Sequence, residues 1–296
     1  MHPYFVSIII PTYNDWGRLS KCLNALAQQN YPSEKLEIIV VNNNPEDHPP
    51  EGYYIPANCS VITKMKPGSY AARNAALKLA NGEIIGFTDS DCIPDNNWVN
   101  NAVNYFINNK SCSRIAGKIC IFFETSSPTK AQLYDKLYAF NQKGYVSKSG
   151  TSVTANLFTY KHVFDKVGYF DEDLMSGGDF LWGTIAHKKG YKIDYVENVK
   201  VKHPARENFK ALVKKERRVG GSQAIFLKKS DSVFINILQF AKDIMPHISE
   251  MKFIFNNAKG LNPINKISIF FIRQYLLSIR AYEKLRVQMG KKPNRA

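Results

Sequence analysis

The sequence predicts an α/β fold with a mostly parallel sheet, followed by a helical and strongly basic C-terminal extension. Two patterns in the first ninety residues indicate this class: short apolar runs of the length of buried strands, and segments with apolar residues at helical spacing. They occur in the order strand, helix, strand, strand, helix, strand, which is typical of a parallel sheet covered by helices. The third observation is the charge, most of which lies after residue 205.

The first ninety residues contain four expected strands and two expected helices. The strands are Val6–Ile10, Leu36–Val41, Val61–Thr63 and Ile84–Thr88, and the helices are Arg18–Gln28 and Ser69–Ala80. Pro11 is expected to end the first strand, because proline has no backbone N–H to donate. Leu19 and Leu23 lie on one face of the first helix. Asn81-Gly82 is expected to cap the second helix.

The same patterns continue in the next hundred residues, separated by more polar segments. Helices are expected at Trp98–Ile107, Ala131–Phe140 and Phe180–Lys189, and strands at Ile115–Phe123 and Ile193–Val196. The polar segment Thr125–Gly150 surrounds the second of these helices, and Val163–Phe170 leads into a loop at Gly177–Asp179. After about Arg206 the pattern becomes helical and basic, with apolar residues at helical spacing from Val233 to Ile248 and again from Pro263 to about Met289.

Composition indicates a globular intracellular protein. With 296 residues, 44% of them apolar, the chain is long enough for one large domain with an extension. Its five cysteines include no C-x-x-C pair, which disfavours a zinc site or a disulfide framework and fits a reducing cytoplasm. No signal peptide is evident, and no stretch approaches the ~18 apolar residues of a spanning helix. We therefore expect a cytoplasmic location, free or peripheral on the inner face of the cell membrane.

Two carboxylates stand at the end of the most apolar strand. Ile84–Thr88 ends in Asp89-Ser90-Asp91, and if the strand continued, the two aspartates would point to the same side. Two like charges cannot be buried there without compensation. A divalent cation supplies it, and hard carboxylate oxygens suit Mg²⁺ or Mn²⁺. In α/β folds, ligands bind at this end of the strands.

Five short motifs follow one another along the chain. They are Val6-Ser7-Ile8-Ile9-Ile10-Pro11-Thr12-Tyr13-Asn14, Gly68-Ser69-Tyr70-Ala71-Ala72-Arg73-Asn74, Thr88-Asp89-Ser90-Asp91 with Pro94 and Trp98, Val167-Gly168-Tyr169-Phe170-Asp171-Glu172 with Gly177-Gly178-Asp179, and Val201-Lys202-His203-Pro204. In this order and approximate spacing, the chain resembles a family 2 glycosyltransferase over roughly residues 5–225. The resemblance implies the GT-A type of fold, which is Rossmann-like with a mostly parallel sheet, and an inverting transfer of a sugar from a nucleotide-diphosphate donor.

The resemblance also implies a role for particular residues. The donor nucleotide would be bound by Pro11, Thr12, Tyr13, Asn14, Asn42, Arg73, Asp89 and Ser90. The metal, Mn²⁺ or Mg²⁺, would be held by Asp91 and His203, with Asp89 facing the ribose or sharing the ion. Such an ion would neutralise the diphosphate as a Lewis acid. Arg73 near a helix N-terminus suits anions, although a surface ion pair is the alternative.

Asp179 is the expected general base for the acceptor hydroxyl. The two glycines before it allow a sharp turn and a close approach to a ligand, and a carboxylate there can accept a proton. A helix N-cap is the alternative role, because aspartate is favoured at that position. For His203 the alternative is an ordinary core or surface histidine.

Two positions depart from the family pattern. Family members commonly have Glu-Asp where this chain has Gly178-Asp179, so any acceptor contact made by that glutamate is missing. The second strand commonly ends in an aspartate that reads uracil, and the matching residue here is Asn42. An amide oxygen can still accept from the ring N–H. A UDP-sugar is therefore the expected donor, with GDP- and dTDP-sugars left open.

The C-terminal segment carries most of the charge. Residues 206–296 contain 19 Lys and Arg against 6 Asp and Glu, a net +13 of the chain's +15. Lys266, Arg273 and Arg280 fall seven residues apart on one helical face, beside apolar residues. A basic amphipathic helix is typical of contact with an anionic membrane, where each such charge contributes ~1 kcal/mol. The alternatives are packing on the catalytic domain and a homodimer contact; no pattern for nucleic-acid binding is present.

The sequence thus predicts residues 1–225 as a catalytic domain, with a nucleotide-sugar half at about 1–97 and an acceptor half at about 98–225, and residues 226–296 as the basic extension. The expected enzyme transfers a hexosyl or N-acetylhexosaminyl group to a surface glycan or lipid-linked acceptor in polysaccharide biosynthesis. One alternative is a non-catalytic, basic membrane- or polymer-binding module on the same fold. The other is a sugar-nucleotidyltransferase, disfavoured because Pro11–Asn14 is not a Gly-rich loop.

Overall fold

The computed structural model describes residues 4–226, 233–246 and 248–294. It divides into two compact units: unit 1 is Met1–Cys120, Phe140–Leu174 and Gly178–His203, and unit 2 is Ile121–Ala139, Met175–Gly177 and Pro204–Ala296. Helix α8 (Phe209–Phe226) thus belongs to unit 2, although the sequence analysis placed it before the boundary near residue 225. Compact units need not coincide with functional domains, so that boundary stays a prediction.

Unit 1 is built around an eight-stranded sheet with the strand order β3-β2-β1-β4-β7-β6-β8-β5. The strands are β1 (Val6–Thr12), β2 (Leu36–Asn42), β3 (Cys59–Thr63), β4 (Ile84–Thr88), β5 (Ile93–Pro94), β6 (Arg114–Phe122), β7 (Asn156–Tyr160) and β8 (Ile193–Pro204). β1 pairs in parallel with β2 and β4, and β2 with β3. β7 runs antiparallel to β4 and β6, as β5 does to β8. The predicted α/β fold is confirmed.

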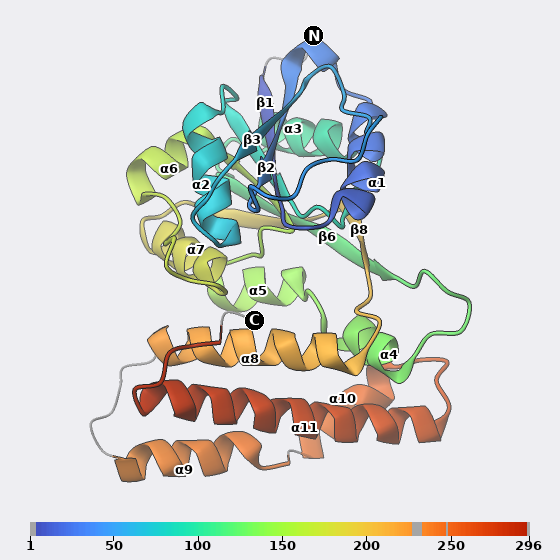
Figure 1. Cartoon of the computed structure of the whole chain (residues 1–296), viewed down its shortest axis with the longest axis vertical. Helices are drawn as coiled ribbons and strands as arrows, with labels where there is room; N and C mark the ends of the chain where they lie inside the picture. Colours follow the sequence, from blue (N-terminus) through green and yellow to red (C-terminus); the bar gives the residue numbers. More distant parts are fainter. Residues whose placement is uncertain (1–3, 227–232, 247, 295–296) are drawn as a thin grey trace. The chain divides into compact units, whose positions relative to one another are not determined.

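Helices cover both faces of this sheet, which explains why its central strands β1, β2 and β4 are buried almost throughout (Figure 1). One face is covered by α1 (Trp16–Ala27) and α3 (Trp98–Asn108), and the other by α2 (Ser69–Leu79), α6 (Lys161–Val167) and α7 (Gly178–Lys188). Along β1, Ile8 and Ile10 pack in the first core and Ile9 in the second. This alternation follows from the two-residue period of a strand. The helix α5 (Gln142–Ser149) and the 3₁₀ turn η1 (Ser33–Lys35) complete the elements of this unit.

Two local predictions in unit 1 were wrong. β1 does not stop at Pro11 but runs to Thr12 and stays paired with β2 over its whole length. Its pairing with β4 already ends at Ile9, so the N–H that Pro11 lacks is not needed on that side. Asn81-Gly82 does not form a left-handed cap, because Ala80 ends α2 in an extended conformation. Gly82 instead lies so close to β1 that a Cβ there would meet Ser7 N at 2.5 Å. That glycine serves close packing rather than capping.

Unit 2 is helical, as predicted for the C-terminal extension. It contains α4 (Lys130–Tyr138), α8, α9 (Val233–Ile244), α10 (Ile248–Asn257) and α11 (Pro263–Gln288). Leu212, Ile254 and Leu276 belong to its core, and α8 lies so close to α11 that a Cβ on Gly220 would clash with the Arg280 carbonyl. Pro246 separates α9 from α10, where the sequence suggested one continuous helix. Among the described residues, no helix is long and apolar enough to span a membrane.

The predicted basic stripe of α11 is used inside unit 2. Arg280 pairs with Glu216 of α8, and Arg273 pairs with Glu250 of α10 at 3.5 Å. Lys266 reaches a backbone carbonyl of α10. The alternative of packing is therefore favoured for this stripe, because intramolecular partners already hold its charges. An anionic membrane as a partner stays a prediction that needs another surface.

Candidate active site

The ends of the parallel strands bring the predicted donor-side residues together. β1 and β2 end in register, with Thr12 beside Asn42, and Asp89 follows β4, the other neighbour of β1. Carboxyl ends of parallel strands lie on one edge of a sheet, where α/β folds bind ligands. The donor-side residues predicted from sequence, other than Arg73 on α2, all lie in the last two positions of these three strands or just after them.

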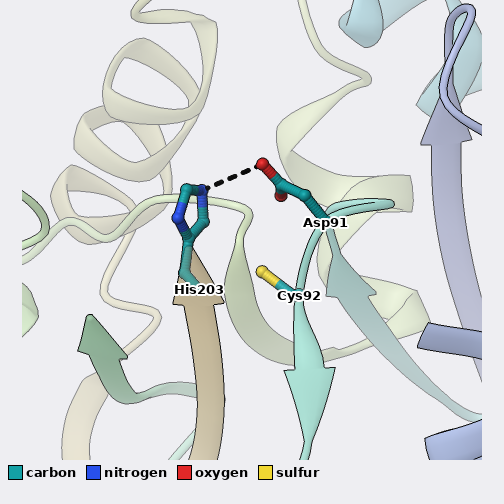
Figure 2. A group of neighbouring side chains, drawn as sticks. All are labelled: Asp91, Cys92 and His203. Atoms are coloured by element: carbon teal, nitrogen blue, oxygen red, sulfur yellow. Dashed lines mark ion pairs between the residues drawn. The ribbon is translucent and has the colours of Figure 1, made fainter. Parts of the chain in front are cut away.

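Asp91 and His203 form the centre of a candidate metal site. The His203 Nε2 lies 3.4 Å from the Asp91 Oδ2, and Figure 2 shows the two side chains pointing towards each other. The short antiparallel pair of β5 and β8 brings them together, because Asp91 precedes β5 and His203 is near the end of β8. His203 is buried and Asp91 half-buried, so a ligand could reach the carboxylate.

The donor atoms fit Mn²⁺ or Mg²⁺ better than a soft metal. Ligand atoms of Asp91, Cys92 and His203 all lie within 4.8 Å of one another. Burial raises the pKa of the Cys92 thiol well above its usual value, and a protonated thiol is a poor ligand. One carboxylate and one imidazole remain, a set that accepts Mn²⁺ and leaves positions for phosphate oxygens. When bound, such an ion supplies Lewis-acid stabilisation of the diphosphate.

Asp89 forms its ion pair with a different residue, Arg73. β4 ends at Thr88, and residues 89–92 form a turn closed by the Cys92 N–H donating to the Asp89 carbonyl at 3.0 Å. The alternation of a continuing strand therefore does not apply to the two aspartates. The carboxylate of Asp89 instead forms an ion pair with Arg73 at 2.5 Å. Arg73 is buried in the first turns of α2, so its charge helps to hold Asp89 at the donor edge.

The loops of the donor edge differ in how much they expose. Tyr13 is 64% exposed and Asn14 is also exposed, so both are accessible to a ligand. Asn42 is buried; its amide donates to the Asp47 carbonyl at 2.6 Å and its oxygen accepts from the Asn44 N–H at 3.0 Å. Ser90 Oγ contacts Asp15 at 3.5 Å. Recognition of the donor nucleobase by Asn42 stays a prediction, and it requires the Asn42 side-chain oxygen to accept a second hydrogen bond.

Asp179 is buried in the first turn of α7 and accepts three hydrogen bonds. The Tyr70 hydroxyl donates to Oδ1 at 3.1 Å, the Phe180 N–H to the same oxygen at 3.0 Å, and the Thr154 N–H to Oδ2 at 3.3 Å. Burial raises the pKa of Asp179, although the nearby Arg73 charge and these bonds partly oppose the shift. A carboxylate held at a raised pKa is suited to accept a proton near neutral pH.

The structure explains why Gly178 replaces the glutamate of the family pattern. A Cβ at this position would meet the Tyr70 ring at 2.8 Å. That ring is held in place by the hydrogen bond from its hydroxyl to Asp179 and by packing against the Phe170 ring, with 5.6 Å between the ring centroids. Tyr70 therefore occupies the space that a longer side chain at 178 would need.

We expect Gly178→Glu to destabilise the protein by about 1–3 kcal/mol, the usual cost of overpacking a core. Removing the ring in a Gly178→Glu/Tyr70→Ala double variant should recover part of that loss. Gly17→Glu is the matched control, because Gly17 is also helical and has nothing within 4 Å of its missing Cβ. Thermal unfolding measures all three, and equal stability of Gly178→Glu and the control would contradict the steric explanation.

Three residues of this site were not singled out from the sequence. Tyr70 lies within a quoted motif, yet its contact with Asp179 spans 109 positions and has no local signal. Cys92 directly follows the acidic motif and could have been noted as a buried thiol. Thr154 contributes a backbone N–H, which no sequence pattern reveals.

Comparisons with known proteins agree with this geometry. The model of the family "Glycosyl transferase family 2" matches residues 7–166. Glycosyltransferase AglE of Haloferax volcanii is 36% identical over 227 residues, covering 74% of this chain and 73% of that protein. The dolichyl N-acetyl-alpha-D-glucosaminyl phosphate 3-beta-D-2,3-diacetamido-2,3-dideoxy-beta-D-glucuronosyltransferase of Methanococcus voltae is 25% identical over 248 residues, covering 79% of this chain and 76% of that protein.

Solved structures share the fold. The mannosyltransferase PcManGT from Pyrobaculum calidifontis, in complex with GDP-Man and Mn²⁺, has a TM-score of 0.54 at 19% identity and covers 98% of this chain and 76% of its own. Residues 1–349 of Staphylococcus aureus TarS, in complex with UDP-GlcNAc, have a TM-score of 0.56 at 17% identity and cover 97% of this chain and 92% of theirs. With the family model, the AglE likeness and the site geometry in agreement, this chain is a glycosyltransferase that belongs to glycosyl transferase family 2.

Proposed function

We propose that this enzyme transfers a hexosyl or N-acetylhexosaminyl group from a UDP-sugar, with inversion, to a hydroxyl of a glycan or lipid-linked acceptor. The observation that carries the proposal is that unit 1 contains both parts of such a site. Asp91 and His203 lie together at the donor edge, and Asp179 is a buried carboxylate with a raised pKa. Inversion rests on the family resemblance. A non-catalytic member of the family would have been expected to lose Asp91 or Asp179. Both carboxylates are present, which disfavours the alternative of a binding module without activity.

In the proposed reaction the acceptor hydroxyl gives its proton to the Asp179 carboxylate. The acceptor oxygen forms a bond to the anomeric carbon of the sugar while the bond from that carbon to the diphosphate oxygen breaks, and the nucleoside diphosphate leaves. Tyr70 and the Thr154 N–H keep the Asp179 carboxylate in place through hydrogen bonds. Arg73 holds Asp89 at the donor edge, and its charge favours the diphosphate.

The acceptor and the location are proposed from the relatives. The name of the Methanococcus voltae relative specifies a dolichyl-phosphate-linked acceptor, which supports a lipid-linked acceptor here. TarS was solved with UDP-GlcNAc and PcManGT with GDP-Man and Mn²⁺, so UDP and GDP donors both fit this fold. We propose a location at the cytoplasmic face of the cell membrane, where donor and lipid-linked acceptor meet.

Thermal shift identifies the donor nucleotide. We expect UDP with Mn²⁺ to raise the apparent stability by about 2.7 kcal/mol at a hundredfold excess over Kd, since a ligand that binds only the folded state stabilises it by mass action. GDP and dTDP are the comparison nucleotides, and UDP or Mn²⁺ alone is the control. A larger shift with GDP would change the donor, whereas no shift with any nucleotide, or an equal shift without metal, would contradict the site.

A further inference from the structure

The helix α9 turns its apolar side outward. Its outward side, continued by the residue after the helix, consists of Phe234, Ile237, Leu238, Ile244 and Met245, which are between 37% and 67% exposed. At 100° per residue these positions lie within one side of the helix. Their spacing is that of a core-facing helix, yet the side chains remain exposed in the described structure.

The opposite side of α9 is polar and faces its own unit. Asn236 is only 7% exposed. Asp243 forms an ion pair at 2.8 Å with Lys284 of α11, itself mostly buried. A surface helix normally places its apolar side inward and its polar side outward, and α9 has the reverse arrangement. The burial of α9 within unit 2 therefore does not account for its apolar residues.

The helix α11 adds a second exposed apolar stripe to unit 2. Ile264, Ile267, Phe271, Tyr275 and Tyr282 are spaced three, four, four and seven residues apart, and each is between 44% and 71% exposed. This spacing keeps them on one side of the helix, away from the side on which Arg273 and Arg280 make their ion pairs. Exposed apolar surface of this extent marks an interaction site in a folded protein, and tyrosine suits an interface between apolar and aqueous regions.

The charge of this region selects the partner. Residues 206–296 carry a net +13, and exposed lysines such as Lys242 and Lys252 lie on α9 and α10. A contact between two copies would bring two such charges together, whereas an anionic bilayer attracts them. We propose that the apolar sides of α9 and α11 dock unit 2 on an anionic lipid surface, with α9 lying in the plane of the interface. The proposal goes beyond the transfer reaction and does not depend on which donor or acceptor is used.

Vesicle co-sedimentation of the full chain tests this proposal. We expect binding to vesicles of phosphatidylcholine and phosphatidylglycerol, and much weaker binding to phosphatidylcholine alone. Salt should weaken the binding without abolishing it, because ions screen the charges beyond a Debye length of ~8 Å at physiological ionic strength and leave the apolar contacts. Phe234→Gln/Leu238→Gln should lower the partition coefficient about tenfold or more, as loss of two inserted side chains implies. The matched control, Met65→Gln/Leu79→Gln, removes equally exposed apolar residues from unit 1 and should bind as the wild type does.

Two further measurements keep the outcomes distinct. Unfolding curves and the nucleotide-induced thermal shift should be the same in both variants, so a failed donor assay would not count against the docking surface. Absence of wild-type binding to anionic vesicles at low salt, or unchanged binding of Phe234→Gln/Leu238→Gln, would overturn the proposal. The proposal would also be overturned if the wild type were a dimer and Phe234→Gln/Leu238→Gln dissociated it without changing lipid binding. In that case a second copy of the chain would cover the apolar sides of α9 and α11.

Discussion

Asp91→Asn is expected to abolish metal-dependent binding of the donor nucleotide and to reduce turnover by on the order of 10²–10³-fold, the usual effect of removing one preorganised electrostatic group. The neutral amide of asparagine is a far weaker ligand than a carboxylate for a hard divalent ion. His203, 3.4 Å away, cannot replace it as a charged ligand. The fold should persist, because the Asp91 side chain lies at the end of the sheet and outside the apolar cores.

The measurement combines nucleotide binding at a series of Mn²⁺ concentrations with a transfer or donor-hydrolysis assay. Asp165→Asn is the matched control, because Asp165 is an exposed carboxylate on α6 far in sequence from the motif. The control should titrate with Mn²⁺ as the wild type does. If Asp91→Asn transfers or hydrolyses donor at the wild-type rate, Asp91 is not the metal ligand.

Asp179→Asn is expected to lower turnover by about 10²–10⁴-fold, as for a lost general base, with donor affinity nearly unchanged. Asparagine can still accept the Tyr70 hydrogen bond at Oδ1, so the local structure should survive. Donor binding, measured by thermal shift or calorimetry, distinguishes a role of Asp179 as the general base from a structural role at the start of α7. A variant that loses donor affinity but retains normal chemistry would show that Asp179 serves to cap and fix α7.

The same residue predicts the acid limb of the activity profile. Burial raises the pKa of Asp179 above that of an ordinary carboxyl group, and the base must be deprotonated to act. Activity should therefore fall, as pH decreases, through a pKa above ~3.9, the usual value for aspartate. This limb should be absent from the residual activity of Asp179→Asn, and an identical limb in both proteins would assign it to another group.

The parts of the fold that sequence predicted best are those whose signal is local. β4 was predicted residue for residue, because a fully buried apolar run ends there at two carboxylates. β7 was missed, although it lies between β4 and β6. Its first residue, Asn156, is polar but buried, and its side chain bonds to Trp98 Nε1 and to the Val199 carbonyl. Those partners are distant in sequence, so the burial of such a residue cannot be inferred from its neighbours.

The candidate site shows the same division. The acidic motif and the Gly-Gly-Asp loop are visible in the sequence because each is short and contiguous. The meeting of Asp91 with His203 depends on the pairing of β5 with β8, a two-residue strand that no periodicity reveals. Only the family resemblance indicated that His203 belongs near the metal. The ion pairs of Arg273 and Arg280 were likewise invisible, because helical spacing shows which residues share a face but not what that face contacts.

The steric exclusion between Gly178 and Tyr70 constrains how this acceptor loop can change over evolution. A glutamate at 178 fits without a steric clash only after the Tyr70 ring has gone, and loss of the ring first removes a hydrogen bond from Asp179. The two positions therefore form a coupled pair in which the order of substitution matters. Transfer of the loop of a relative into this chain would need to carry its partner position along with it. Each of positions 70 and 178 can carry a large or a small residue, which gives four combinations. Among natural relatives, we expect a large aromatic residue at 70 together with a long side chain at 178 to be the rarest of them.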